Sequence, residues 1–125
     1  MLATGVDSLD RLQDGVTRVD EPMVLAIEAD LGAWEARMTM PREFVLPGAT
    51  RLSAALEVAR VTARRAERRV VALGHSGHPL GPWILAWINR TADLLWVLAR
   101  VAEAAEGETA VPAVERGIGR RKVAL

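Results

Sequence analysis

The chain has 125 residues, a formal net charge of zero and no cysteine, and half of its residues are hydrophobic. This length predicts a single domain with a sizeable core. The lack of cysteine excludes disulfides and thiolate metal sites, and the zero net charge argues against a nucleic-acid partner. Alanine, leucine and valine fill the apolar positions, with one phenylalanine and no tyrosine, so the composition favours an all-α helical bundle over a sheet.

The N-terminal part of the chain contains a weakly patterned stretch followed by a helix. We interpret residues 1–19 as a weakly structured N-terminal segment. Asp20 is a suitable N-cap, and Pro22 suits the first turn of a helix that begins there. Pro41 ends this helix or follows its end closely. Residues 39–49 then form a loop.

Two further helices complete the predicted bundle, which spans residues 20–106. Thr50 is a good N-cap for a second helix at about 51–73, followed by a Gly/Pro-rich loop over 74–82. The third helix is predicted at about 83–105. Residues 107–125 are expected to form a flexible C-terminal tail.

Charged side chains on the second helix form a compact group. At about 100° per residue, Arg60, Arg64 and Glu67 fall within roughly 60° of one another. Two guanidinium groups beside an apolar seam could hold a phosphate. The alternative is a solvated, salt-bridged face in which Glu67 neutralises Arg64 at i, i+3 spacing. The apolar stripe beside these residues consists of Leu52, Ala55, Leu56, Ala59, Ala63, Ala66, Val70 and Leu73.

The third helix carries one polar face on an otherwise apolar cylinder. Asn89, Asp93, Trp96 and Arg100 lie at i, i+4, i+7 and i+11 and share that face. The alternative for Asn89 and Asp93 is a buried polar pair that fixes helix register. Because three helices can hardly surround so apolar a helix, we expect other copies of the chain to cover it, in an oligomer.

A membrane location is not expected. The most apolar stretch, residues 83–102, is interrupted by charged and polar side chains, which makes a membrane span improbable. No secretory signal is visible near Met1. The cytoplasm is therefore the predicted location.

Three blocks of sequence occur together: Phe-Val-Leu-Pro-Gly at 44–48, an arginine-rich block at 59–68, and Ile-Asn-Arg-Thr-Ala-Asp-Leu-Leu with a following Leu-Ala-Arg within 88–100. In order and spacing they resemble the PduO-type ATP:cob(I)alamin (corrinoid) adenosyltransferases, over roughly residues 20–103. The resemblance implies a trimer of helical bundles with active sites between subunits. It also implies transfer of the 5′-deoxyadenosyl group of ATP to cob(I)alamin (vitamin B12 in its reduced form), with Mg²⁺, giving adenosylcobalamin and triphosphate.

The resemblance assigns roles to residues of the nucleotide site. Arg60 and Arg64 match arginines at the ATP phosphates and are the candidate catalytic and ATP-binding residues. Glu67 and Asn89 match polar residues that help to form the same site. Fixed guanidinium groups would stabilise the charge that grows on the departing triphosphate. No general base is required.

The resemblance also assigns a corrin contact and two supporting positions. Phe44 matches the aromatic residue that crowds the lower face of the corrin, although it could equally be a core or loop anchor. Asp93 and Arg100 match the family's helix motif and are expected to support the site structurally. No metal site is predicted in the protein itself.

The sequence departs from the family pattern at several points. Residues 1–19 do not reproduce the Gly/Thr-rich segment that wraps the triphosphate, so the chain resembles the C-terminal two-thirds of the family fold. Ala49 stands where the family has a second glycine, and Glu57 stands where it has a histidine. The alternative function is a non-catalytic module derived from the enzyme. Such a module would bind cobalamin, or act as a scaffold or regulator for a full-length adenosyltransferase or a B12-dependent enzyme.

Overall fold

The computed structural model describes residues 11–39, 41 and 45–107. These residues are predominantly helical, and an isolated bridge joins Asp14 to Arg18. The predicted all-α class is therefore confirmed. The helices are α1 (Glu21–Glu35), α2 (Arg51–His75) and α3 (Ile84–Ala105).

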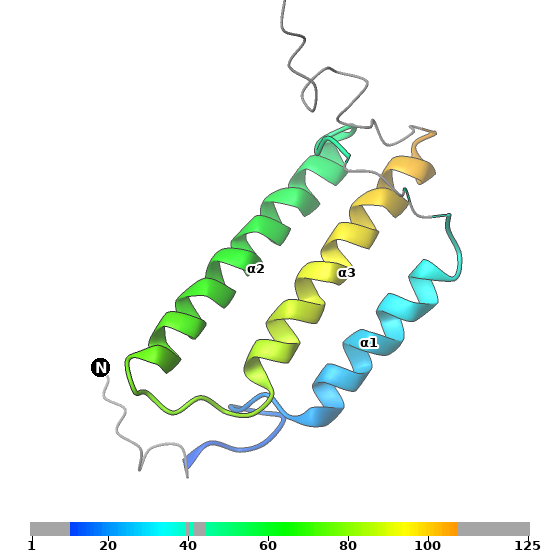
Figure 1. Ribbon diagram of the computed structural model, residues 1–125. Coiled ribbons are helices and arrows are strands. Elements are labelled where there is room, and N and C mark those ends of the chain that lie inside the picture. Colours follow the sequence, from blue (N-terminus) through cyan, green and yellow to red (C-terminus); the bar gives the residue numbers. More distant parts are fainter. Residues whose placement is uncertain (1–10, 40, 42–44, 108–125) are drawn as a thin grey trace, which may run out of the picture.

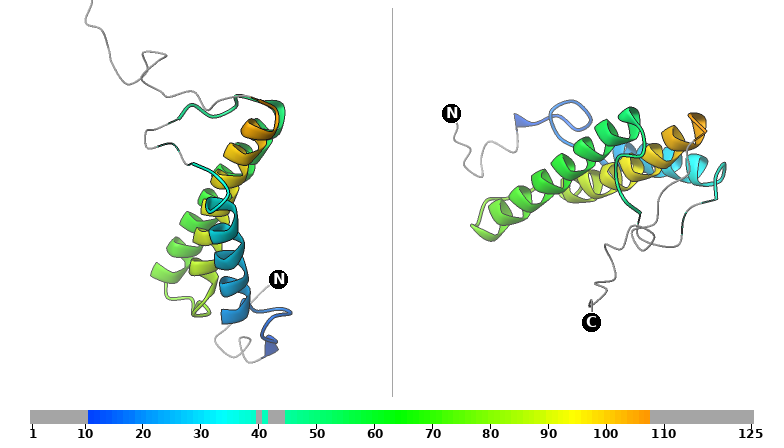
Figure 2. Two further views of the ribbon diagram at one scale, coloured as in Figure 1. Left: turned by 90° about the vertical axis from the view of Figure 1, so that its right-hand side faces the viewer. Right: turned by 90° about the horizontal axis from the view of Figure 1, so that it is seen from above.

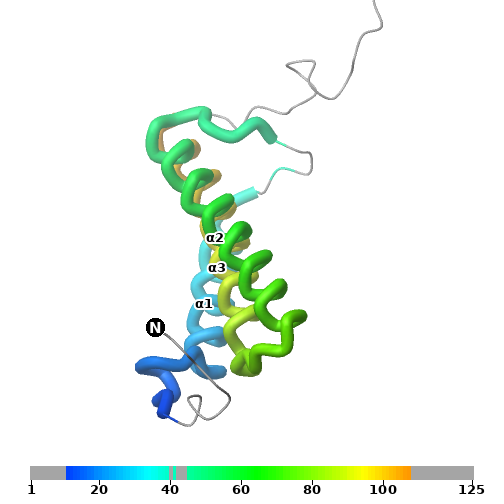
Figure 3. Tube along the Cα trace, turned by 90° about the vertical axis from the view of Figure 1, so that its left-hand side faces the viewer, coloured from blue at the N-terminus to red at the C-terminus, as the bar shows by residue number. Residues whose placement is uncertain are grey.

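The three helices lie side by side, with α3 between α1 and α2 (Figure 1). Both outer helices pack against α3, and in the described part of the chain they do not pack against each other. The side views in Figures 2 and 3 show that the three helices form one thin, twisted layer. A single layer has two broad faces that none of these three helices covers.

The N-terminus of α1 follows the predicted cap. The Asp20 carboxylate accepts a hydrogen bond from the backbone N–H of Met23 at 3.1 Å, and Pro22 lies in the first turn. This pairing satisfies one of the backbone donors that a helix start leaves unpaired. The helix ends at Glu35, well before Pro41. Pro41 therefore follows the helix and does not terminate it.

The second helix begins as predicted but extends further. Thr50 and Ser53 form a reciprocal capping box at its start. The helix runs to His75, so the predicted loop boundary at Gly74 was wrong. Gly74 is helical and serves close packing, because a Cβ on it would lie 2.8 Å from the Leu80 side chain. In this loop the backbone reaches positive φ at Gly77 (93°), after the helix has ended.

The buried apolar residues are concentrated on α3, as its central position requires. The predicted apolar stripe of α2 is largely exposed in the single chain; Leu52, for example, is 52% exposed. This happens because α2 turns Ser53 and Glu57 toward the interior instead. The buried hydrophobic residues are Val24, Ile88, Ala92, Val97, Ala99 and Ala102.

Residues 13–18, before α1, form a hydrogen-bonded turn. The Gln13 carbonyl accepts from the backbone N–H groups of residues 16–18, and its own N–H donates to the Thr17 hydroxyl at 2.7 Å. Residues 1–10 and 108–125 lie outside the described residues, so the domain boundaries drawn from the sequence stay predictions. In the described part of the chain, no helix has the length and apolar character needed to cross a bilayer.

Candidate functional site

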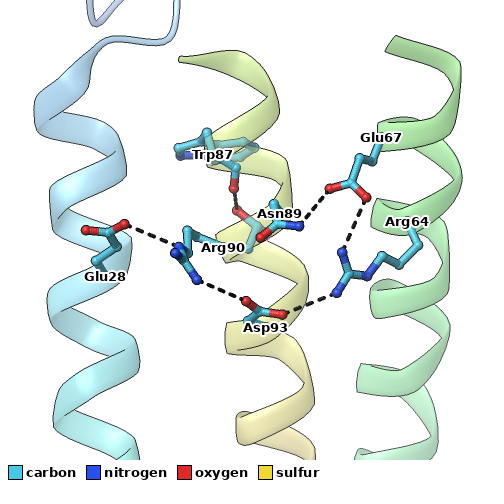
Figure 4. Close-up of polar contacts among 8 residues, drawn as sticks. Glu28, Arg64, Glu67, Trp87, Asn89, Arg90 and Asp93 are labelled. Carbon is cyan, nitrogen blue, oxygen red and sulfur yellow. Dashed lines mark hydrogen bonds and ion pairs between the residues drawn. The ribbon is translucent and has the colours of Figure 1, made fainter. Parts of the chain in front are cut away.

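Polar side chains of α2 and α3 meet midway along the two helices, in what we call the Arg64 network (Arg64, Glu67, Asn89 and Asp93). Arg64 donates to Glu67 on its own helix and to Asp93 on α3, both at 3.3 Å. The Asn89 amide donates to the other Glu67 oxygen at 3.1 Å. Figure 4 shows these four side chains converging between the helices. The network holds α2 and α3 in register through charged and amide groups.

The network continues to the third helix of the layer. Arg90 donates to Asp93 at 3.4 Å and to Glu28 of α1 at 3.2 Å (Figure 4). One connected set of side chains therefore links all three helices.

The Arg64 network is half-exposed. The side chains of Arg64 and Asp93 are 34% and 36% exposed. Ion pairs in such surroundings are screened by water and contribute about 1 kcal/mol or less each. Arg64 can therefore exchange a protein carboxylate for a ligand anion at little cost to the fold.

A second group, the Glu57 cluster (Glu57, Arg60, Arg100 and Glu103), lies toward the start of α2 and the end of α3. Arg100 donates to Glu57 at 3.0 Å and to Glu103 at 3.1 Å. Arg60 donates through Nε to the second Glu57 oxygen at 2.6 Å. The Arg100 guanidinium carbon also lies 5.1 Å from the centre of the Trp96 ring, a cation–π contact.

Three members of the Glu57 cluster are buried. The side chains of Arg100, Glu103 and Glu57 are 2%, 1% and 8% exposed. Arg100 Nε lies 3.1 Å from a Glu103 oxygen but is not aligned for a hydrogen bond, and Arg100 Nη1 has no hydrogen-bond partner within the described residues. Removing one partner from such a buried pair leaves an uncompensated charge, which costs about 3–5 kcal/mol. These charges consequently depend on one another.

Arg60 connects the buried cluster to the surface. Its side chain is 29% exposed, and in the described part of the chain only its Nε has a partner. The two terminal nitrogens are therefore available to an anion, in the planar fork that suits phosphate. Arg60 and Glu57 border an open, mostly apolar pocket of about 340 Å³. Its other lining residues are Pro47, Gly48, Ala54, Val58 and Val61.

The structure brings together some of the predicted site residues and separates others. Arg64 meets Asp93, and Glu67 meets both Arg64 and Asn89. The predicted i, i+3 pairing of Glu67 with Arg64 is present. Asn89 and Asp93 each bond to α2, and no hydrogen bond joins them to each other.

Arg60 and Arg100 lie apart from that group, in the Glu57 cluster. The sequence had placed Arg100 only as a supporting residue; it is buried beside Glu57 and Glu103, and its role in the site stays a prediction. Phe44 lies outside the described residues, so its predicted corrin contact stays a prediction. Sequence reasoning missed Glu57 and Glu103 as members of the cluster. The available signal was their i, i+3 spacing from Arg60 and Arg100.

A family model described as cobalamin adenosyltransferase matches residues 2–102. A cobalamin adenosyltransferase of Cupriavidus metallidurans is 38% identical over 93 residues, covering 74% of this chain and 50% of that protein. A corrinoid adenosyltransferase of Bacillus subtilis is 36% identical over 90 residues, covering 72% of this chain and 46% of that protein. This chain thus spans about half the length of these curated relatives.

The fold is similar to solved structures as well. A variant PduO-type ATP:corrinoid adenosyltransferase from Lactobacillus reuteri, complexed with cobalamin and ATP, superposes with a TM-score of 0.72 at 28% identity. The match covers 82% of this chain and 54% of that chain. A second variant of that protein, also complexed with cobalamin and ATP, gives a TM-score of 0.73.

Proposed function

Because this chain belongs to the cobalamin adenosyltransferase family, we propose that it transfers the 5′-deoxyadenosyl group of ATP to cob(I)alamin. The products are adenosylcobalamin and triphosphate. The observation that carries the proposal is the half-exposed Arg64, which lies between α2 and α3. Its guanidinium pairs with two carboxylates, those of Glu67 and Asp93, that a ligand anion can replace. A cation in this state is suited to receive a polyphosphate.

The reaction is a direct displacement at carbon. The electron pair of Co(I) forms the bond to the ribose C5′, and the C5′–O bond breaks with its electron pair leaving on triphosphate. Because negative charge grows on the leaving group, Arg60 and Arg64 would stabilise the transition state more than the bound substrate. Alignment of cobalt with C5′ would contribute much of the remaining acceleration. No side chain has to accept a proton.

The other candidate residues would hold these arginines and the substrates. Glu67, fixed by the Asn89 amide, would orient Arg64 and border the nucleotide. Asp93 would hold Arg64 from the α3 side until ATP binds. Phe44 would crowd the lower face of the corrin, favouring the four-coordinate cobalt that is easier to reduce. Arg100 would act from within the core, through Glu57.

Magnesium would arrive with the nucleotide. In the described part of the chain no three acidic or histidine side chains cluster as a metal site. Mg²⁺ in ATP-using sites is bound largely by substrate phosphates and water. The protein surface therefore does not have to supply its ligands, and an arginine-rich α2 can bind the phosphates instead. We place this reaction in the cytoplasm, where ATP is supplied; cell fractionation checks that assignment.

We further propose that the chain works as a homotrimer. The support is the exposed apolar stripe on α2, including Leu52 and Leu73, on a helical layer with uncovered faces. Contiguous apolar surface of this kind marks an interaction site. Sedimentation equilibrium checks the assembly: a trimer mass is expected, and a monomer at micromolar concentration would contradict it.

The test of the activity is an adenosylation assay with reduced cobalamin and Mg-ATP. The proposal predicts conversion to the adenosylcobalamin spectrum, with no conversion when ATP is omitted. A spectral change on binding corrinoid without any product would instead identify a non-catalytic binding module. If the chain neither binds corrinoid nor forms product, both functions are contradicted.

A further inference from the structure

Glu57 is a buried carboxylate that holds two arginines at once. One oxygen accepts from Arg60 Nε at 2.6 Å, and the other accepts from Arg100 Nη2 at 3.0 Å. We propose that Glu57 is a positioning residue that aims Arg60 at the leaving triphosphate. This inference rests on the proposed adenosyl transfer.

The contact with Glu57 orients the Arg60 fork. An arginine on a helix surface has large rotamer freedom, which an incoming anion would have to freeze. Here Glu57 takes the Nε edge, and the two terminal nitrogens are left without partners in the described part of the chain. The outer edge of the guanidinium, formed by Nη1 and Nη2, can bind two phosphate oxygens in a bidentate manner. The pairing thus leaves the outer edge free for a phosphate.

Glu57 can act as a fixed support because it is itself held from the core. Arg100 reaches it from α3, and Arg100 is held in turn by Glu103 and packed on Trp96. The side chains of Arg100 and Glu103 are almost fully buried, whereas Arg60 is 29% exposed. A chain of charge pairs therefore runs from the interior, through Glu57, to a guanidinium that borders an open pocket.

The charges decide which kinetic constant Glu57 should affect. The cluster contains two guanidinium groups and two carboxylates, so Glu57 lowers the positive potential that Arg60 offers to bound ATP. This loss of potential opposes the gain in ATP binding that comes from pre-orienting Arg60, so the two effects on ground-state binding offset each other. The contribution of Glu57 is alignment, which matters when charge develops on the leaving group. The loss of Glu57 should therefore lower kcat and leave the KM for ATP nearly unchanged.

The experiment compares Glu57→Gln with Glu103→Gln in the full chain. Each change removes one buried carboxylate beside Arg100 with nearly the same shape, but only the first touches Arg60. We expect Glu57→Gln to lower kcat roughly tenfold, with the KM for ATP within about threefold of wild type. Glu103→Gln, which acts on Arg60 only through Arg100 and Glu57, should lower kcat by less than about threefold, although both variants lower the melting temperature. Assays are run well below both melting temperatures.

A double-mutant cycle with Arg60→Ala separates the positioning of Arg60 from a general destabilisation of the fold. In an Arg60→Ala background, measured by single turnover, Glu57→Gln should cause no further loss, because its effect passes through Arg60. Three outcomes would each overturn the inference. They are a wild-type kcat in Glu57→Gln, equal losses of kcat in the two glutamine variants, and an additive loss in the Arg60→Ala background. An inactive wild-type chain would overturn the proposed function itself, and the inference with it.

Discussion

The Glu57 cluster and the Arg64 network both join α2 to α3 through charged side chains, yet they differ in burial. Arg100 and Glu103 are almost fully buried, whereas Arg64 and Asp93 are about one-third exposed. In the first group the buried charges depend on neighbours that water cannot replace. In the second, water or an anion can replace each partner.

This difference separates what supports the fold from what can bind a ligand. A buried charge that loses its partner destabilises the protein, so its partners are in effect permanent. A half-exposed charge forms weak pairs, so it can release a carboxylate for a phosphate. Arg60 is the exception that joins the two regions, because it is anchored by a buried carboxylate and open at its outer edge.

The largest expected effect is on stability, from Arg100→Met. The change would leave Glu57 with Arg60 as its one remaining cation and would leave Glu103 with none. Both carboxylates are buried. The free energy of unfolding should fall by about 3–5 kcal/mol, as measured by urea denaturation. Arg90→Met, which removes only half-exposed pairs, is the matched control and should cost about 1 kcal/mol or less. Similar losses in both variants would erase the distinction between the two regions.

The next effect is on catalysis, from Arg64→Ala. Removing one fixed donor to a developing charge lowers kcat by about 10²–10³, while the free energy of unfolding should change by about 1 kcal/mol or less. Turnover and denaturation are measured on the same preparation. Arg65, an exposed neighbour on α2, supplies the control, since Arg65→Ala should leave both quantities unchanged. An Arg64→Ala variant that turns over normally would remove Arg64 from the site.

A smaller effect is expected at the start of α2, which carries Glu57. Thr50→Ala removes one half of the capping box and should lower the free energy of unfolding by about 1 kcal/mol. Thr62→Ala is the control, because the Thr62 hydroxyl only donates to a carbonyl of its own helix. If the two substitutions cost the same, the cap does not stabilise this helix end.

The smallest effect is expected at the far end of the Arg64 network. Glu28→Ala removes the exposed pair between α1 and α3 and should change the free energy of unfolding by about 0.5 kcal/mol. Turnover should stay at the wild-type level, because Arg64 keeps both of its carboxylates. A loss of turnover above about threefold would show that the network acts as one unit.

Much of the fold could be predicted from the sequence because helix starts depend on local chemistry. Asp20 and Thr50 cap α1 and α2 as expected. The end of α2 could not be predicted, because Gly74 indicates a loop until its close contact with Leu80 is known.

The candidate site was predictable where the residues share one helix face. Arg64 with Glu67 follows from i, i+3 spacing, and the placement of Asp93 and Asn89 on one side of α3 follows from their i, i+4 spacing. The role of Glu57 did not follow, because a glutamate three residues before an arginine is typical of a solvated helix face. Only the crossing of α3, which brings Arg100 beside it, shows that this carboxylate is buried.

The most direct test of the central claim is a calorimetric titration of Mg-ATP into the wild-type chain and into the Arg60→Ala/Arg64→Ala double variant. The account predicts saturable binding by the wild-type chain and none by the double variant, with both proteins folded by circular dichroism. Equal dissociation constants for the two proteins would contradict the assignment of these arginines to the triphosphate.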